Sequence, residues 1–128
     1  MVRYLLDTNI VIAHFAQEPA VDARLVPEAE IFIPSIVLGE LYYGAEKSGL
    51  GRANRNRIEK FAANNTVIAC DAETARRYAI VRNRLRLKGR PIPENDMWIA
   101  AAALQYNMVL VTRDAHFRDV EYLKLERW

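Results

Sequence analysis

The sequence opens with Val2-Arg3-Tyr4-Leu5-Leu6-Asp7, and a related pattern returns late in the chain in Leu110-Val111-Thr112-Arg113-Asp114. In both places a mostly apolar run is followed by an aspartate. An apolar run without strict alternation predicts a strand that is buried on both faces, as in a parallel sheet covered by helices. Because the carboxyl ends of parallel strands share one edge, we expect Asp7 and Asp114 to lie at that edge together.

The rest of the chain alternates between strand-like and helix-like segments, with no repeat, low-complexity tract or linker. Strands are expected at Val2–Leu6, Ile31–Ile33, Thr66–Ala69, Met108–Val111 and Tyr122–Leu125. Helices are expected at Ile10–Ala16, Ser35–Glu46 with Ser35 as its cap, Arg52–Ala63, Ala72–Leu87 and Glu94–Tyr106. A polar turn is expected at Asp7-Thr8-Asn9. This order predicts an α/β sandwich with a mostly parallel central sheet.

The composition agrees with one domain spanning residues 1–128. The net charge of +2 neither indicates nor opposes an anionic partner. No apolar run approaches the roughly 20 residues of a membrane helix, and Asp7 comes too early for a signal peptide. Cys70 is the only cysteine, so we expect no internal disulfide, a cytoplasmic protein and a buried side chain at a strand end.

Two helices carry a carboxylate on the face that is expected to pack inward. The helical neighbours of Glu40 are Ile36, Val37, Tyr43 and Gly44. Those of Asp96 are Ile99, Ala100 and Ala103, and Asp96 also lies in a first helical turn, where the helix dipole favours an ionised carboxylate. An inward carboxylate needs a cation or a hydrogen-bond network. A structural salt bridge is the ordinary explanation for either residue alone.

The four carboxylates together suggest a metal site. Lysine and arginine gather elsewhere, mainly at 52–57 and 76–90, so no basic residue obviously neutralises Asp7, Glu40, Asp96 and Asp114. If the four converge, their repulsion raises their pKa values unless a divalent cation offsets it. Oxygen ligands suit Mg²⁺ or Mn²⁺ better than zinc. His14 and His116 lack a partner at metal-site spacing, so we expect ordinary surface or capping roles for both.

Four segments in this order resemble the PIN-domain ribonucleases, and most closely the VapC-type toxins of toxin–antitoxin pairs. They are Leu5-Leu6-Asp7-Thr8-Asn9, Pro34-Ser35-Ile36-Val37 leading to Glu40 and Gly44, Asn95-Asp96-Met97-Trp98-Ile99-Ala100-Ala101, and Leu110-Val111-Thr112-Arg113-Asp114 with Phe117. The ending Leu123–Trp128 is also similar to that family. The resemblance spans essentially the whole chain.

This resemblance implies a three-layer α/β/α fold and Mg²⁺- or Mn²⁺-dependent hydrolysis of RNA, with tRNA among the substrates. By position, Asp7, Glu40, Asp96 and Asp114 become the acidic quartet. Asp7 and Asp96 are the expected metal ligands, while Glu40 and Asp114 act through water or a second ion. Thr112 matches a supporting hydroxyl, and Thr8 and Asn9 are weaker candidates for orienting Asp7. The resemblance also implies a homodimer and a VapB-type antitoxin partner.

RNA needs a cationic surface, and the segment 72–87 offers one. Tyr78, Val81 and Leu85 form the stripe that is expected to face the core. Arg82 and Arg86 lie on another stripe, and Arg90 extends it toward the helix of Asp96. An ordinary solvated face explains these charges equally well. The role of the basic group Arg52–Arg57 is equally open, since this group could contact RNA or an acidic antitoxin segment.

Other functions remain open at this point. A phosphoaspartate receiver has an acidic pair after its first strand, and a dehalogenase-type phosphatase has Asp-x-Asp there, whereas here Asp7 is followed by Thr8 and Asn9. A PIN-fold RNA-processing nuclease has the same chemistry without the toxin role. A non-catalytic module that binds RNA or protein is a further alternative, which a complete acidic quartet disfavours.

Overall fold

The computed structural model describes all 128 residues and contains one five-stranded sheet. The strands are β1 (Arg3–Leu6), β2 (Glu30–Pro34), β3 (Thr66–Ile68), β4 (Val109–Val111) and β5 (Leu125–Glu126). They lie in the order β3-β2-β1-β4-β5, and every neighbouring pair is parallel. The parallel sheet predicted from the apolar runs is therefore confirmed.

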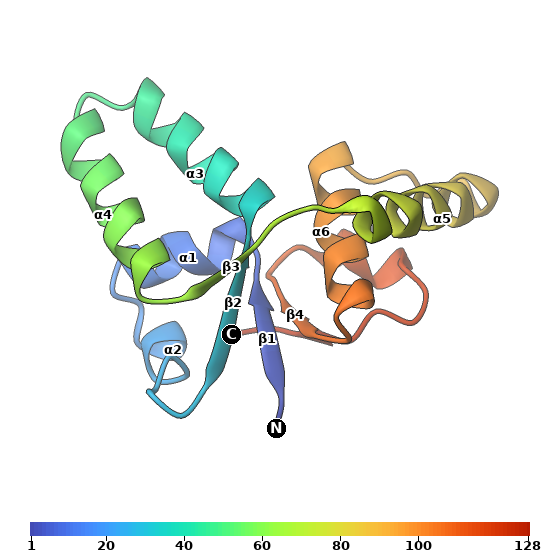
Figure 1. Cartoon of the computed structure of the whole chain (residues 1–128), viewed down its shortest axis with the longest axis horizontal. Coiled ribbons are helices and arrows are strands. Elements are labelled where there is room, and N and C mark those ends of the chain that lie inside the picture. The colour runs from blue at the N-terminus through green and yellow to red at the C-terminus, as the bar shows by residue number, and fades with distance from the viewer.

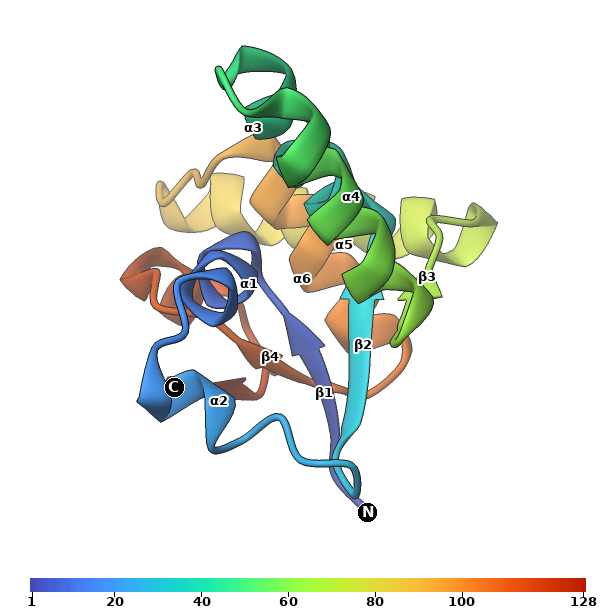
Figure 2. The ribbon, with the colours of Figure 1, turned by 90° about the vertical axis from the view of Figure 1, so that its left-hand side faces the viewer.

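Helices cover both faces of this sheet. They are α1 (Thr8–Phe15), α2 (Pro19–Asp22), α3 (Ser35–Lys47), α4 (Gly51–Ala63), α5 (Ala72–Lys88) and α6 (Glu94–Gln105), with a 3₁₀ turn, η1, at Ala115–Asp119. Figure 1 shows α1, α2 and α4 on one side of β1 and β2, with α5 and α6 on the other, and Figure 2 shows the same layers after a quarter turn. The expected three-layer α/β/α fold is confirmed. None of these helices is long and apolar enough to cross a membrane.

The centre of the sheet places two strand ends side by side. Leu5, Leu6, Leu110 and Val111 are fully buried, as the mostly apolar runs predicted. Leu6 is in register with Val111, and the Asp7 N–H donates to the Val111 carbonyl at 3.0 Å. The residues that follow β1 and β4 therefore emerge together at the upper edge of the sheet in Figure 1.

Some local predictions were wrong. Asp7-Thr8-Asn9 is not a free turn, because Asp7 caps α1 and the helix begins at Thr8. Ser35 is the first residue of α3 and Pro34 precedes it, without a side-chain cap. The predicted last strand is displaced to Leu125–Glu126, because Tyr122 has a φ of 66°, which is incompatible with an extended strand.

The sequence did not predict the short helix α2 or the 3₁₀ turn η1, and the predicted burial of Cys70 was wrong. The helix α2 has only four residues and begins at Pro19, and η1 is a single 3₁₀ segment, so neither has enough length for a periodic pattern. Cys70 is exposed instead of buried, because it follows the edge strand β3, where no further strand covers it.

Candidate active site

The four predicted carboxylates line one cleft of about 550 Å³ at the carboxyl edge of the sheet. Asp7 follows β1, Asp114 follows β4, Glu40 comes from α3 and Asp96 from α6. Thr8, Asn9, Ile12, Pro93, Glu94, Asn95 and His116 complete the lining. The cleft contains no lysine or arginine among its lining residues. Four segments that are far apart in the sequence thus bring their negative charges to one place.

Asp7 is the most buried of the four, with 3% of its surface exposed. Its Oδ1 accepts the Thr8 N–H at 2.8 Å, and its Oδ2 accepts the Thr112 hydroxyl at 2.7 Å. The Asn9 side-chain N–H also donates to Oδ2 at 3.3 Å, while the Asn9 side-chain oxygen Oδ1 accepts the Arg113 backbone N–H at 3.2 Å. These contacts from Thr8, Asn9 and Thr112 fix the direction of the Asp7 carboxylate.

Glu40 reaches the cleft through a contact that the helical pattern did not predict. The Thr8 hydroxyl donates to Glu40 Oε1 at 3.0 Å, so the Thr8 side chain holds Glu40 while its backbone holds Asp7. The inward face proposed around Glu40 was partly wrong, because Tyr43 is 64% exposed and Gly44 is exposed as well. Only the Val37 side of α3 is fully buried, and Glu40 itself is half-buried.

Asp96 pairs with a histidine from the other side of the cleft. His116 Nε2 lies 2.6 Å from Asp96 Oδ2, although 20 positions separate the two residues. The prediction of an ordinary surface or capping role for His116 was therefore wrong. It failed because η1, which was not recognised, turns the chain after Asp114 and brings His116 into the cleft. His14, by contrast, contacts Asp22 at a half-exposed site.

Burial and mutual repulsion destabilise the charged forms of these acids. Burial raises the pKa of Asp96 to about 6, helped by the negative charge of Asp7 and opposed by His116. Burial also raises the pKa of Asp7, although the Thr112 and Thr8 hydrogen bonds oppose this shift. The pKa of Glu40 is raised by burial, against the hydrogen bond from Thr8. Such shifts mark a site that a cation would stabilise.

The donor set fits a hard divalent cation. One ligand atom from each of Asp96, Asp114 and His116 lies within 4.8 Å of the others. With Asp7 and Glu40 in the same cleft, the available donors are mainly carboxylate oxygens. Mg²⁺ and Mn²⁺ prefer such oxygen-rich surroundings, and an imidazole nitrogen is a better ligand for Mn²⁺ than for Mg²⁺.

Known proteins are similar to this chain over essentially its whole length. The PIN-domain family model matches residues 4–122, which is most of the chain. This chain belongs to the PIN-domain family. Within it, ribonuclease VapC2 of Haemophilus influenzae is 35% identical over 131 residues, covering all of this chain and 99% of the relative. The tRNA(fMet)-specific endonuclease VapC of Shigella flexneri has the same identity and coverage.

Solved structures of VapC-containing complexes share the fold. The VapBC2 complex of Rickettsia felis, bound to a promoter DNA fragment, has a chain that is 33% identical, with a TM-score of 0.91 and coverage of 100% of this chain and 99% of that one. DNA-bound VapBC of Salmonella typhimurium gives 30% identity, a TM-score of 0.92 and the same coverage. Membership of the PIN-domain family excludes the phosphoaspartate alternatives.

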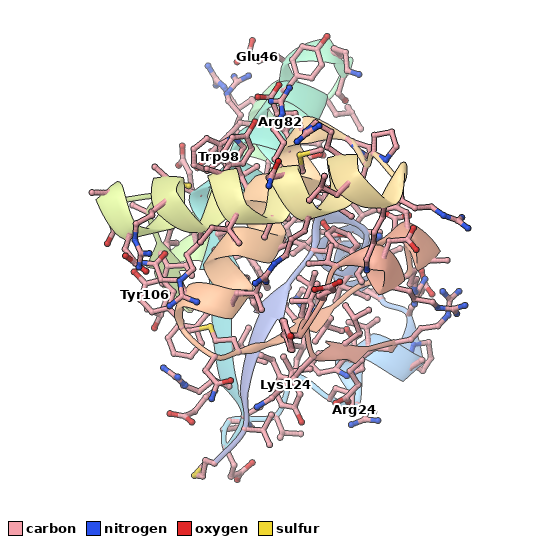
Figure 3. The ribbon with its side chains drawn as sticks, turned by 90° about the vertical axis from the view of Figure 1, so that its right-hand side faces the viewer. Arg24, Glu46, Arg82, Trp98, Tyr106 and Lys124 are labelled. Carbon is pink, nitrogen blue, oxygen red and sulfur yellow. The ribbon has the colours of Figure 1, made fainter.

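The three arginines predicted to bind RNA lie outside the acidic cleft of this PIN-domain chain. The Arg82 guanidinium donates to the Tyr78 hydroxyl at 2.6 Å and lies 3.6 Å from Glu94. Figure 3 shows Arg82 of α5 near Trp98 of α6, and the Tyr78 ring stacks on the Trp98 ring with 4.0 Å between their centroids. Arg86 contacts Asn83, and Arg90 is exposed in the loop before α6.

The predicted core stripe of α5 is buried at Val81 and Leu85 but only half-buried at Tyr78.

Sequence reasoning missed three polar residues of the cleft. These are Glu94, Asn95 and His116. Glu94 and Asn95 immediately precede Asp96 in the first turn of α6, so their nearness to the cleft could have been inferred from that helix start. Glu94 also connects the cleft to α5, because its Oε1 accepts the Tyr78 hydroxyl at 2.9 Å.

Proposed function

We propose that this chain is a Mg²⁺- or Mn²⁺-dependent endoribonuclease that acts as the toxin of a VapBC-type pair, its 128 residues forming one nuclease domain. One observation carries the proposal: four carboxylates from distant segments line a single cleft that has no lysine or arginine in its lining. Nothing in the cleft except His116 offsets their charge. A structural salt-bridge role does not explain such a surplus of negative charge.

Asp7 and Asp96 are the residues that would hold the ion directly, with Glu40 and Asp114 acting through water or a second ion. When bound, the cation supplies charge neutralisation at a phosphate and lowers the pKa of a water molecule. The residue set fits this role, since it provides oxygen donors in a partly buried cleft.

The chain's own residues prepare the site by fixing the acids. Thr112 lies between two of them: its hydroxyl donates to Asp7, and its oxygen accepts the Asp114 N–H at 3.0 Å. Thr8 connects two of the carboxylates, because its N–H donates to Asp7 and its hydroxyl donates to Glu40. His116 holds Asp96. The carboxylates of Asp7, Glu40 and Asp96 are thereby oriented before substrate arrives, which reduces the reorganisation that hydrolysis requires.

The names of relatives suggest the substrate and the partner. Because two relatives are named tRNA(fMet)-specific endonucleases, we propose initiator tRNA as the first substrate to test. Because the similar structures are VapBC complexes, we propose a VapB-type antitoxin as the partner, in the cytoplasm where tRNA is used. A homodimer remains a prediction, which sedimentation of the purified protein checks.

The structure offers the antitoxin a groove next to the acids. A groove of about 340 Å³ between α1, α3 and α4 is mainly apolar and includes Glu40 at the cleft and Arg57 at its rim. The apolar side chains lining it include Ile12, Phe15, Leu41, Ala45 and Ile58. An amphipathic antitoxin segment in this groove would bury its apolar face and end at the cleft, which blocks access of RNA.

The direct test is cleavage of an initiator tRNA transcript by the purified protein with Mg²⁺, with Mn²⁺ and with EDTA. We expect defined fragments with either metal and none with EDTA. Cleavage that persists in EDTA would refute the metal-dependent mechanism. Binding of tRNA without cleavage under every condition would favour the non-catalytic module.

The toxin role has a separate test. Expression in a bacterial host should arrest growth, and Asp7→Asn at the same protein level should abolish the arrest. Co-expression of the cognate antitoxin should relieve it. Cleavage in the test tube without growth arrest would leave a PIN-domain RNA-processing nuclease.

A further inference from the structure

A nucleic acid cannot approach the acidic cleft without cations next to it. Five carboxylate residues line the cleft, namely Asp7, Glu40, Glu94, Asp96 and Asp114, while His116 is its only basic residue. A bound metal ion would offset part of this charge at the bond to be cleaved, but the neighbouring phosphates of an RNA strand would still meet a negative surface. Arginines at the border of the cleft are therefore the groups to examine.

One small pocket adjoins the cleft and carries such arginines. It has a volume of about 180 Å³, and Asp114 lines both the pocket and the cleft. Arg113 follows β4, Arg118 comes from η1, and Arg127 follows β5. Because Asp114 borders both, a strand of RNA that leaves the cleft past Asp114 would meet this pocket next.

The ion pairs of the structure decide which of these charges are available. The Arg113 guanidinium is neutralised by both carboxylate oxygens of Glu18, at 3.0 and 3.3 Å. Glu126, the other acid of the pocket besides Asp114, pairs with Arg24 at 3.1 Å. Arg118 and Arg127 form no ion pair and are exposed.

The absence of ion pairs at Arg118 and Arg127 distinguishes this pocket from the basic face of α5. There Arg82 lies 3.6 Å from Glu94, and both Arg84 and Lys88 approach Glu121. A phosphate must compete with a carboxylate at every basic residue of α5 except Arg86. Arg118 and Arg127, by contrast, bring two guanidinium groups without an ion pair into one pocket. Charge complementarity to a phosphate is therefore greater at the pocket beside Asp114.

The pocket is also fixed relative to the acids. The Thr112 N–H donates to the Glu126 carbonyl at 3.1 Å, which ties the end of β5 to the residue that orients Asp7. The Arg127 guanidinium donates to the Arg113 carbonyl at 2.7 Å, one residue before Asp114. A phosphate held by Arg127 would thus have a defined position relative to the cleft.

We propose that Arg118 and Arg127 form a binding site for an RNA backbone phosphate adjacent to the one that is hydrolysed. The inference rests on the proposed nuclease function and adds the direction in which the strand leaves the cleft, past Asp114 toward η1 and β5. The contact is to the backbone, so it contributes affinity and register without reading the base sequence.

The experiment measures binding separately from cleavage. Fluorescein-labelled initiator tRNA transcript is titrated with the Asp7→Asn protein and with the same protein carrying Arg118→Gln and Arg127→Gln, in millimolar Mg²⁺ at several salt concentrations. We expect the added pair to weaken binding roughly tenfold and to lower the slope of log affinity against log salt by about one unit, because a phosphate contact that released counterions is lost.

Two further variants separate charge from fold. Arg118→Lys with Arg127→Lys keeps both charges and should restore most of the affinity. Arg84→Gln with Lys88→Gln removes the same charge from α5, where both residues already pair with Glu121, and should change the slope little. In the otherwise wild-type enzyme, Arg118→Gln with Arg127→Gln should raise KM more than it lowers kcat.

The outcomes that overturn the inference are specific. Unchanged affinity and slope in the glutamine pair would overturn it, and so would an equal loss in the Arg84 and Lys88 control. A loss confined to Arg82→Gln with Arg86→Gln would move the phosphate site to α5. If wild type neither binds nor cleaves the tRNA, the proposed function itself has failed. If it cleaves while the glutamine pair binds normally, only this inference fails.

Discussion

Asp7 and Asp71 occupy the same local position in two different helices. Asp7 precedes α1 and accepts the Thr8 N–H at 2.8 Å, while Asp71 precedes α5 and accepts the Thr74 N–H at 3.0 Å. Asp71 even forms a full capping box, in which the Thr74 hydroxyl accepts the Asp71 N–H. By the geometry of the helix start alone, Asp71 is the better cap.

Their electrostatic surroundings are opposite. Hydrogen bonds from Thr74 and Gln105 hold the pKa of the exposed Asp71 below its usual value. Burial and the nearby charge of Asp114 raise the pKa of Asp7 despite its own hydrogen bonds. A capping role therefore does not distinguish a structural carboxylate from a functional one. What distinguishes Asp7 is that it is buried beside other acids without a basic partner.

The largest expected difference is in activity. Asp7→Asn should lower the rate of tRNA cleavage by roughly two orders of magnitude or more, since it removes a charge that holds the metal. Asp71→Asn should cleave at close to the wild-type rate. Initial rates at saturating tRNA and Mg²⁺ measure both. Similar losses in the two variants would mean that Asp7 acts only as a helix cap.

The second difference concerns metal binding without any substrate. Mg²⁺ should raise the melting temperature of wild type, because a ligand that binds only the folded state stabilises it. The rise should be smaller in Asp96→Asn and unchanged in Asp71→Asn. Thermal melts in EDTA and in millimolar Mg²⁺ give these shifts. An equal rise in all three proteins would place the ion elsewhere.

The third difference concerns the melting temperature without metal, on which substitutions at Asp96 and Asp71 should have opposite effects. Asp96→Asn should melt at or slightly above the wild-type temperature in EDTA, because it relieves repulsion from Asp7 and Glu40. Asp71→Ala should melt a few degrees lower, because it loses a helix cap. A clear loss of stability in Asp96→Asn would show that its contact with His116 is a structural ion pair.

The positions of the acids could largely be predicted from the sequence. Asp7 and Asp114 follow buried strands, and the sheet order puts β1 beside β4. Asp96 lies in the first turn of α6 above Ile99, Ala100 and Ala103, all fully buried. These signals are local patterns that a parallel sheet converts into proximity, so no long-range contact had to be known.

The remaining features depend on contacts that no local pattern encodes. His116 enters the cleft only because a short 3₁₀ turn follows Asp114, and a five-residue segment has no period to recognise. Glu40 is held by Thr8, 32 positions away, while its helical neighbour Tyr43 points to solvent. Which arginines are free to bind a phosphate also depends on ion pairs, such as Arg113 with Glu18, that form only in the folded chain.

The smallest expected effect is the response of stability to pH in EDTA. The folded-state pKa of Asp96 is raised from 3.8 to about 6, so the folded state holds its proton more tightly than the unfolded state. The ionised Asp96 carboxylate therefore lowers the free energy of unfolding. This destabilisation is absent below about pH 4 and grows as the pH rises through 4 to 6. Metal-free wild type should therefore melt higher at pH 5 than at pH 7.

Asp71 has the reverse dependence, which provides the control for this prediction. Its folded-state pKa is lowered, so its stabilising contribution is present above the ordinary value near 3.8 and disappears as the pH falls through the lowered pKa. Asp71→Asn should keep the wild-type rise between pH 7 and pH 5 and lose less stability than wild type in stronger acid. Asp96→Asn should have a smaller rise between pH 7 and pH 5, because only Asp7 and Glu40 still have raised pKa values there. If Asp96→Asn keeps the full rise in melting temperature, protonation of Asp96 is not the cause of that rise. The burial of the Asp96 carboxylate beside Asp7 would then not destabilise the metal-free folded state, and this difference between the cleft and the cap of α5 would be refuted.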